Sequence, residues 1–240
     1  MKKTKATGAA SYGLPYYRGE ESALVTHLLA SARAHKPLCV FTPNAVVAAA
    51  AERDAALSAL LHRADVLVAD GYGCRLAARL SGEAPPPRIA GIDLAEALLA
   101  SADTRGARVF LYGGRFGVAH RAALALGVKY PRLRFAAADG YGKDPVGEIC
   151  AFSPHFVFVC LGFPRQERWI AENAPALGAV CLGLGGSLDV WSGDVARAPR
   201  AVQKAGLEWA YRTVREPHRI TRLLPLPRYF VSCLRHRHRK

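Results

Sequence analysis

The sequence predicts an α/β fold: a Rossmann-like, mostly parallel sheet with helices on both faces, plus a basic C-terminal appendage. Two observations predict this class. Short apolar runs alternate with helical patterns along the 240 residues, and most of these runs are apolar without interruption, as in strands that are buried on both faces. With 51% apolar and 22% charged residues, the chain suits one globular domain of ordinary size with a small appendage.

The expected strands are six apolar runs: LCVFT (38–42), DVLVA (65–69), RVFLYG (108–113), LRFAAA (133–138), HFVFVCLG (155–162) and AVCLGLG (179–185). Helical periodicity between them predicts helices at 44–63, 92–104, 116–129 and 165–175. Asp93 and Glu96 have the spacing of a capping box, which predicts the start of the helix at 92–104. Strands that alternate with helices in this way are typical of a parallel sheet.

Glycines and small polar residues follow each expected strand. The segments are TPN (42–44), DGYG (70–73), GG (113–114), DGYG (139–142), GFPRQE (162–167) and GGSLD (185–189). In open α/β sheets, ligands bind outside the carboxyl ends of the strands. Glycine lets a backbone come close to a phosphate, and helix N-termini favour its negative charge. The sequence therefore predicts a ligand-binding rim to which these segments contribute.

Several common catalytic motifs are missing. YGGRFG (112–117) lacks the G-x-G-x-x-G spacing, so a structural turn is the better interpretation, and an NAD-dependent epimerase or dehydrogenase is disfavoured. No P-loop and no G-x-S-x-G turn is present, which disfavours P-loop NTPases and nucleophile-elbow hydrolases. The eight histidines show no metal-ligand spacing, and the six cysteines form no C-x-x-C pair. We therefore expect no metal site, and reduced, buried thiols at Cys39, Cys160 and Cys181.

The net charge of +14 is concentrated near the C-terminus. Residues 196–240 contain twelve Lys and Arg against two Glu. Such a segment fits nucleic acid, an anionic membrane surface, a phosphate-bearing ligand or plain solvation. No apolar run is long enough to span a bilayer, and the basic start MKKTKATGAASYG is not followed by the apolar core of a secretory signal. A cytoplasmic protein is therefore expected.

A set of motifs has the order and spacing of one known family. The motifs are TPN (42–44), DG (70–71), RIAGID (88–93), GFPRQE (162–167), GLGGSLD (183–189), RAP (197–199), GLEWAYR (206–212) and EPHRITR (216–222). On these motifs the chain resembles, from about Leu38 to about Leu224, the WecG/TagA/CpsF family of bacterial glycosyltransferases.

This resemblance implies an inverting, metal-independent enzyme without a cofactor. Such an enzyme would move an N-acetylmannosamine-type sugar or a related hexose from a UDP-sugar donor to a polyprenyl-diphosphate-linked sugar acceptor. The reaction would take place at the inner face of the bacterial cell membrane, where the enzyme would be peripheral. It would serve the synthesis of wall teichoic acid, enterobacterial common antigen or exopolysaccharide.

The resemblance assigns roles to residues of the first two rim segments. Asp70 matches the family's proposed general base, and inverting transfer needs a base that takes the proton of the attacking hydroxyl. An Asp-Gly pair also commonly serves only to cap a turn. Thr42 and Asn44 match polar residues of the pocket close to the sugar, with Thr42 placed among the catalytic groups. Asn44 could also cap the helix at 44–63.

Other matched residues are expected to bind the substrates. Arg88 would hold a phosphate or a sugar hydroxyl, and Gln166 would bind nucleotide or sugar. Gly185 and Gly186 would let the backbone approach the uridine diphosphate, although a plain tight turn explains them almost equally well.

The C-terminal appendage is expected to close over the active site. In the family its arginines contact the diphosphate, and Arg212, Arg219 and Arg222 match that set. Guanidinium forks would stabilise the leaving UDP without a metal. Residues 223–240 mix apolar and basic side chains, which predicts attachment to an anionic membrane surface. A disordered basic tail is the alternative, and the prolines argue against one continuous helix.

The expected organisation is a core at 1–205 and an appendage at 206–240. The first 20 residues depart from the family pattern, which predicts an altered first strand or a flexible leader. A homo-oligomer is left open. The competing hypothesis is a basic nucleic-acid-binding protein without catalysis, since a basic tail gives salt-dependent phosphate binding. It leaves the polar rim unexplained and no recognition motif is visible, so nucleic acid is not expected as a partner.

Overall fold

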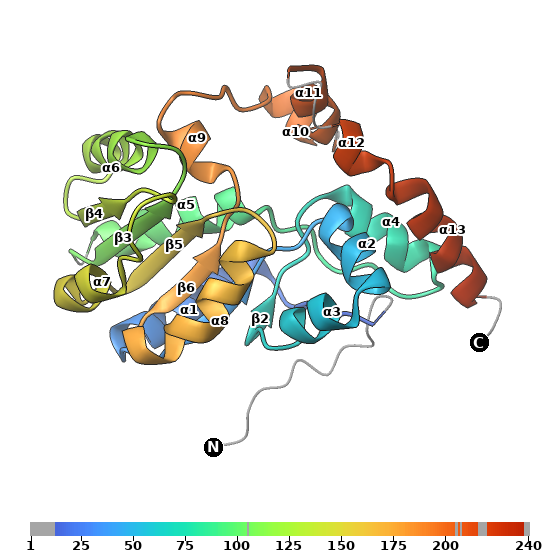
Figure 1. Cartoon of the computed structure of the whole chain (residues 1–240), viewed down its shortest axis with the longest axis horizontal. Helices are drawn as coiled ribbons and strands as arrows, with labels where there is room; N and C mark the ends of the chain where they lie inside the picture. Colours follow the sequence, from blue (N-terminus) through green and yellow to red (C-terminus); the bar gives the residue numbers. More distant parts are fainter. Residues whose placement is uncertain (1–12, 105, 205, 207, 216–219, 238–240) are drawn as a thin grey trace.

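The computed structural model describes residues 13–104, 106–204, 206, 208–215 and 220–237. Its centre is a six-stranded sheet in which all neighbouring strands are parallel, in the order β2-β1-β6-β5-β3-β4 (Figure 1). The strands are β1 (Leu38–Phe41), β2 (Val66–Leu67), β3 (Arg108–Gly113), β4 (Arg134–Ala138), β5 (Phe156–Cys160) and β6 (Val180–Gly183). The predicted α/β class with a parallel sheet is confirmed.

The central strands form because their residues are apolar on both faces of the sheet. Every residue of β1, β5 and β6 is buried, and side chains of the β-branched and aromatic kind fit a pleated, covered surface. Val40 of β1 and Phe158 of β5 both pair with Leu182 of β6, so three neighbouring strands meet in one layer of the core. The run DVLVA supplies only the two-residue edge strand β2.

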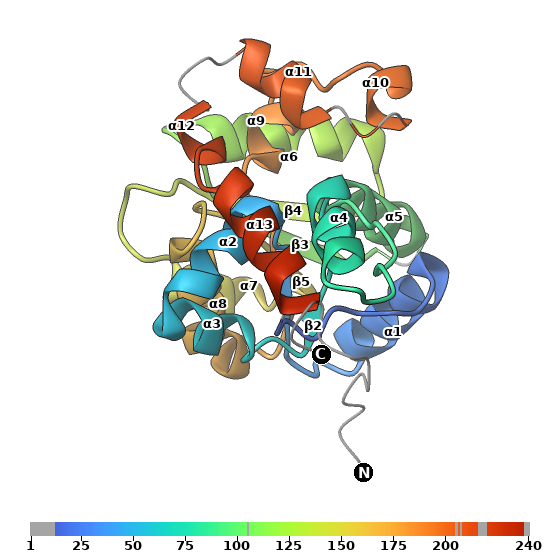
Figure 2. The same cartoon turned by 90° about the vertical axis from the view of Figure 1, so that its right-hand side faces the viewer.

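Helices cover both faces of the sheet (Figures 1 and 2). One apolar layer receives buried side chains from α1 (Glu21–Arg33), α5 (Gly91–Asp103), α6 (Val118–Lys129) and α9 (Ser187–Trp191). The other layer receives them from α2 (Ala45–Arg53), α3 (Ala55–Leu61), α4 (Tyr72–Leu80), α7 (Val146–Phe152) and α8 (Arg165–Leu177). This is the expected two-sided cover.

The helix expected at 44–63 is broken into α2 and α3 at Asp54. Asp54 has an extended backbone, and its Oδ1 accepts hydrogen bonds from the N–H groups of Ala56 (2.8 Å) and Leu57 (3.2 Å). Aspartate is a strong N-cap residue and an unfavourable one inside a helix, so it begins a new helix here.

The expected capping box does not form at α5. The helix begins at Gly91, and no side chain caps its N-terminus. Asp93 already lies in the first turn, and Glu96 accepts hydrogen bonds from Lys129 (2.8 Å) and Trp191 (3.1 Å). The prediction was wrong because both carboxylates bind partners outside the helix, which their spacing does not reveal.

The segment before α1 belongs in part to the core. Leu14 and Tyr16 are buried, and the Tyr17 N–H donates to the Leu67 carbonyl of β2 (2.7 Å). The Tyr16 hydroxyl also donates to Cys74 Sγ (3.5 Å). A flexible leader is therefore the wrong description of these residues, because β2 and α4 give them hydrogen-bond partners and apolar contacts. Residues 1–12 of the expected leader lie outside the described residues.

The cysteines are free thiols. Cys39, Cys160 and Cys181 are buried in strands, as predicted. Burial raises the pKa of Cys39 to about 11 and that of Cys160 to about 12. Thiols with such pKa values stay protonated at neutral pH, so these cysteines act as small apolar packing residues.

The chain after α9 forms short helices and ends in a longer one. α10 (Arg200–Lys204), α11 (Glu208–Arg215) and α12 (Ile220–Leu223) lie beyond the carboxyl edge of the sheet, and α13 (Leu226–Arg237) runs back along the core (Figures 1 and 2). α13 packs against α2 and α4 and buries Tyr229 and Cys233.

Pro225 lies between α12 and α13, so the tail is interrupted as its prolines predicted. In the part of the chain that the structure describes, no helix is both long enough and apolar enough to cross a membrane.

Candidate active site

Strands β1 and β6 are neighbours but send the chain to opposite faces of the sheet. After β1 the turn at 42–44 leads to α2 in one helix layer, and after β6 the turn at 184–186 leads to α9 in the other. In open α/β sheets, ligands bind in the crevice that such a change of direction opens at the carboxyl ends of the strands. We call this part of the carboxyl edge the crevice. Asp70, in the turn after β2, and Gln166, in the first turn of α8 after β5, follow the strands that flank β1 and β6.

Thr42 joins three elements at the crevice. Its hydroxyl donates to the Gly183 carbonyl at the end of β6 (2.7 Å). A Cβ at Gly91 would lie 2.9 Å from the same hydroxyl oxygen, so the first turn of α5 can come close because Gly91 has no side chain. The hydroxyl is half-buried and retains lone pairs for a further donor. The structure thus places Thr42 in the crevice and also gives it a structural hydrogen bond.

Asn44 caps α2, as the helix-capping interpretation predicts. Its Oδ1 accepts hydrogen bonds from the N–H groups of Val46 (2.9 Å) and Val47 (3.2 Å). The side chain is exposed, and among the described residues its Nδ2 has no acceptor. The cap therefore fixes the direction of the side chain and leaves Nδ2 outside the capping bonds.

Asp70 lies in a turn that adjoins the turn of Thr42 and Asn44. The Asp70 N–H donates to the Pro43 carbonyl (3.1 Å), which holds the two turns together. Gly71 has φ +88°, a backbone conformation that favours glycine, and α4 begins at the next residue. The half-buried Asp70 side chain is therefore positioned at the carboxyl edge next to the β1 turn, where the sequence predicted it.

Gln166 lies beneath the glycine turn that follows β6. Its side chain is 5% exposed. Oε1 accepts a hydrogen bond from the Gly185 N–H (3.0 Å), and Nε2 donates to Glu167 Oε1 (2.9 Å). A Cβ at Gly183 would lie 3.0 Å from Nε2, so the strand end also fits closely around the amide. The structure thus makes Gln166 a support of the turn that contains Gly185 and Gly186.

Glu167 completes this support from inside the core, and sequence reasoning missed it. The residue is 2% exposed, and burial raises its pKa against the opposing effect of the hydrogen bond from Gln166. Within the described part of the chain, Oε2 has no hydrogen-bond partner. A charged residue in a polar loop motif is usually exposed, so the sequence carries no signal for this burial.

Arg88 connects the crevice to α10, the helix that directly precedes the appendage. Its guanidinium carbon lies 5.3 Å from the centre of the Tyr72 ring, and its Nη1 donates to the Gln203 carbonyl in α10 (3.5 Å). On the appendage side, Gly206 has φ +75°, and a Cβ there would overlap the Tyr72 ring. Tyr72 follows the Asp-Gly turn directly, so these contacts join the crevice to the start of the appendage. We call the four residues Tyr72, Arg88, Gln203 and Gly206 the appendage joint.

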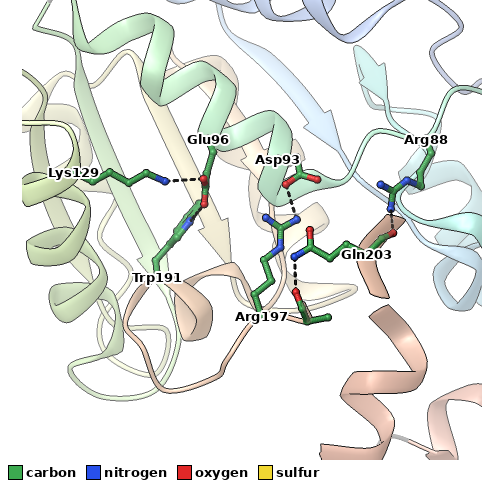
Figure 3. A network of polar contacts seen from close by, with 8 residues as sticks. Arg88, Asp93, Glu96, Lys129, Trp191, Arg197 and Gln203 are labelled. Atoms are coloured by element: carbon green, nitrogen blue, oxygen red, sulfur yellow. Dashed lines mark hydrogen bonds and ion pairs between the residues drawn. The ribbon is translucent and has the colours of Figure 1, made fainter. Parts of the chain in front are cut away.

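A polar network extends the appendage joint to α5 (Figure 3). Arg197 in the RAP motif pairs with Asp93 in the first turn of α5 (2.5 Å). The Gln203 side chain donates to the Ala198 carbonyl (2.6 Å). The RIAGID and RAP motifs, far apart in the sequence, are therefore in contact. Opposite charges in two separate motifs are the signal that could have suggested this pairing.

The three arginines expected near the diphosphate are only partly described. Arg222 lies in α12 with an exposed side chain, and Arg212 lies in α11. The side chain of Arg212 and the whole of Arg219 lie outside the described residues. α11 and α12 lie beyond the carboxyl edge of the sheet, which is the edge where the crevice opens (Figure 1).

These observations define a class of protein. At one crevice of a parallel α/β sheet lie a half-buried carboxylate, a glycine turn and an arginine, and a basic helical segment lies beyond the same edge. In α/β enzymes such an arrangement commonly binds phosphate-bearing ligands. The family model described as "Glycosyl transferase WecG/TagA/CpsF family" matches residues 10–240. The chain belongs to this family and is a glycosyltransferase, as its motifs predicted.

Individual relatives bear the same name in three species. Each is an N-acetylglucosaminyldiphosphoundecaprenol N-acetyl-beta-D-mannosaminyltransferase. The protein of Bacillus spizizenii is 35% identical over 229 residues, which cover 93% of this chain and 89% of the relative. The protein of Bacillus subtilis is 35% identical over 201 residues (82% and 78%), and that of Staphylococcus aureus strain MW2 is 35% identical over 195 residues (79% and 77%).

Proposed function

We propose that this glycosyltransferase moves an N-acetylmannosamine-type sugar, or a related hexose, from UDP to a lipid-diphosphate-linked sugar. The transfer inverts the anomeric centre and needs no metal ion. The observation that carries the proposal is the position of Asp70, a carboxylate held against the β1 turn at the crevice. The names of the relatives at 35% identity support the sugar and the lipid-diphosphate acceptor.

Asp70 acts as the general base. The acceptor hydroxyl oxygen attacks the anomeric carbon of the donor, and the bond from that carbon to the UDP oxygen breaks. Asp70 takes the proton of the hydroxyl as the new bond forms. The negative charge of the carboxylate is thereby lost as UDP leaves with an additional negative charge. Thr42 and Asn44 stand on the adjoining turn, where a hydroxyl and an amide can bind sugar hydroxyls and hold the reacting atoms in line.

Positive charge and backbone N–H groups hold the diphosphate. Arg88 lies at the crevice, Arg212 and Arg222 belong to α11 and α12 beyond the same edge, and Arg219 is the third arginine of the family's set. Guanidinium groups form paired hydrogen bonds with phosphate oxygens and stabilise the charge that develops on the leaving UDP, which is the work that a metal ion does in other enzymes. The Gly185 N–H already binds Gln166, so the Gly186 N–H is the group of the glycine turn that serves the ligand.

The appendage attaches the enzyme to the inner face of the cell membrane. Its described part exposes Leu224, Val231 and Leu234 together with basic side chains such as Arg228. Apolar and basic side chains together suit an anionic lipid surface, and the proposed acceptor carries a lipid that lies in such a surface. The same charge would suit nucleic acid, but membership of a glycosyltransferase family favours the membrane.

A transfer assay tests the proposed function. UDP release is measured with a panel of UDP-sugars and a short-chain lipid-diphosphate-linked N-acetylglucosamine, with and without EDTA. We expect acceptor-dependent release from UDP-N-acetylmannosamine or a related donor, at the same rate in EDTA. Loss of activity in EDTA that Mn²⁺ or Mg²⁺ restores would contradict the arginine-based mechanism. Release that does not depend on the acceptor would contradict transfer.

Replacing Gln166 by alanine is expected to raise the KM for the UDP-sugar several-fold. The Gly185 N–H and Glu167 lose a buried hydrogen-bond partner, so the fold should also lose about 1–3 kcal/mol of stability. Steady-state kinetics and thermal unfolding measure the two effects. Asn173→Ala is the matched control, because within the described residues this amide on α8 donates to the Trp169 carbonyl of its own helix (2.9 Å) and to no other group. If both variants keep the wild-type KM, Gln166 does not support the donor site.

A further inference from the structure

A basic hollow lies away from the crevice, between α2 and α13. Its volume is about 530 Å³, and it is lined by Glu52, Arg53, Pro227, Arg228, Val231, Ser232 and Arg235. Two parts of the chain that are far apart in sequence build it, because α13 packs against α2. The hollow is thus formed by the core and the appendage together.

Three arginines of the lining have no polar partner among the residues that the structure describes. Arg53 is in the last turn of α2, and Arg228 and Arg235 are in α13. Among the described residues, none of the three has a hydrogen bond or an ion pair. Glu52 supplies the carboxylate of the lining, and it already accepts a hydrogen bond from the Ser232 hydroxyl. Unpaired like charges repel each other, so an anion in the hollow would be favourable.

The position of the hollow separates it from the transfer reaction. Arg53 follows Asn44 by nine positions along α2, so about 14 Å of helix lies between them at 1.5 Å per residue. In the proposed reaction, one sugar separates the diphosphate of the acceptor from the attacked carbon. The width of one sugar is less than this length of about 14 Å. An anion in the hollow therefore belongs to a molecule other than the acceptor bound at the crevice.

The apolar neighbours of the hollow indicate which anion fits. Val231 lines the hollow and is 46% exposed, and Leu234 on the same helix is 39% exposed. Exposed apolar side chains beside unpaired arginines match the boundary between lipid tails and phosphate headgroups. A free phosphate would use the arginines but not the apolar side chains.

We propose that this hollow binds the phosphate of an anionic membrane lipid. The inference rests on the proposed membrane-linked acceptor, and it assigns the attachment to a defined site instead of to diffuse charge in the tail. Because α13 also packs against α4, which follows the Asp70 turn, a lipid in the hollow orients the crevice toward the membrane surface. The core residue Arg53 thereby takes part in membrane binding.

Vesicle binding tests the lipid site. The full chain is mixed with phosphatidylcholine vesicles that contain or lack phosphatidylglycerol, and the bound fraction is measured by sedimentation. Arg53→Gln and Arg235→Gln remove a guanidinium from the hollow, and Arg237→Gln is the matched control on the same helix, outside the lining. Thermal unfolding confirms that the variants are folded.

We expect the wild type to bind the vesicles that contain phosphatidylglycerol. Each hollow variant should bind them about tenfold more weakly, because a charge-assisted hydrogen bond is lost. Arg237→Gln should weaken vesicle binding by no more than roughly fivefold, which is the effect of one surface charge. Equal losses for Arg235→Gln and Arg237→Gln would overturn the site in favour of diffuse attraction, and so would wild-type binding by Arg53→Gln.

Two further measurements are needed. The first distinguishes a lipid phosphate from a free phosphate, and the second distinguishes failure of the lipid site from failure of the proposed function. Inorganic phosphate is added as a competitor, and if it displaces the vesicles at low concentration, a free anion is the ligand and the lipid assignment is wrong. Transfer to a water-soluble, short-chain acceptor is measured without vesicles, and Arg53→Gln and Arg235→Gln should match the wild type. Predicted vesicle binding without any transfer would refute the proposed function and leave the lipid site standing.

Discussion

Replacing Asp70 by asparagine is expected to lower the rate of sugar transfer by about 10²–10⁴-fold, the range that a general base contributes. Asparagine has nearly the same shape but cannot take the proton of the attacking hydroxyl. The backbone bond from Asp70 to the Pro43 carbonyl does not involve the side chain, so the turn should stay in place. UDP-sugar binding and the temperature of unfolding should therefore change little, and kcat should carry the loss.

The second Asp-Gly pair of the chain offers the matched control. Asp139 also follows a strand, but its Oδ1 accepts a hydrogen bond from the Gly117 N–H (3.0 Å) in the neighbouring loop. Asp139→Asn should retain transfer and lose at most some stability. A wild-type kcat for Asp70→Asn, or equal losses for both variants, would remove Asp70 as the base.

Replacing Gly206 by alanine is expected to reduce transfer by about 10²-fold or more, a loss comparable to that of one preorganised charge-stabilising group. The position has φ +75°, where a side chain is strained by roughly 1–2 kcal/mol, and a Cβ would overlap the Tyr72 ring. The appendage joint should open, which would move the appendage arginines away from the diphosphate. The core should stay folded because α13 packs on it separately.

A double-mutant cycle identifies the cause of that loss. Tyr72→Ala removes the ring that the new Cβ would meet and also the ring on which Arg88 lies. Combined with Gly206→Ala it should fall below Tyr72→Ala alone only by the cost of the positive φ at position 206, because the overlap disappears with the ring. Losses that simply add, or a Gly206→Ala variant with full activity, would show that the joint does not control the appendage.

The apolar runs predicted the fold because the sheet is parallel and covered on both faces. Strands such as β5 are buried throughout, so they leave an uninterrupted apolar signature in the sequence. The break at Asp54 was missed because helical periodicity continues across it, and only the side-chain cap reveals the second helix. The segment at 14–17 was missed because its burial depends on β2 and α4, which come later in the chain.

The sequence predicted the positions of those candidate site residues that come shortly after a strand. Asp70, Thr42 and Asn44 come directly after two neighbouring strands, so they must share one edge of the sheet. The burial of Gln166 and Glu167 depends instead on the turn after β6, and no local pattern announces such a contact. The same holds for Tyr72, which is important only because Arg88 and Gly206 reach it from other parts of the chain.

The most direct test of the proposed mechanism is the anomeric configuration of the product, determined by NMR after transfer from an α-linked UDP-sugar. Direct attack by an acceptor hydroxyl that Asp70 deprotonates inverts the anomeric carbon, so a β-linked product is predicted. An α-linked product would mean retention, and it would contradict a single displacement with Asp70 as its base.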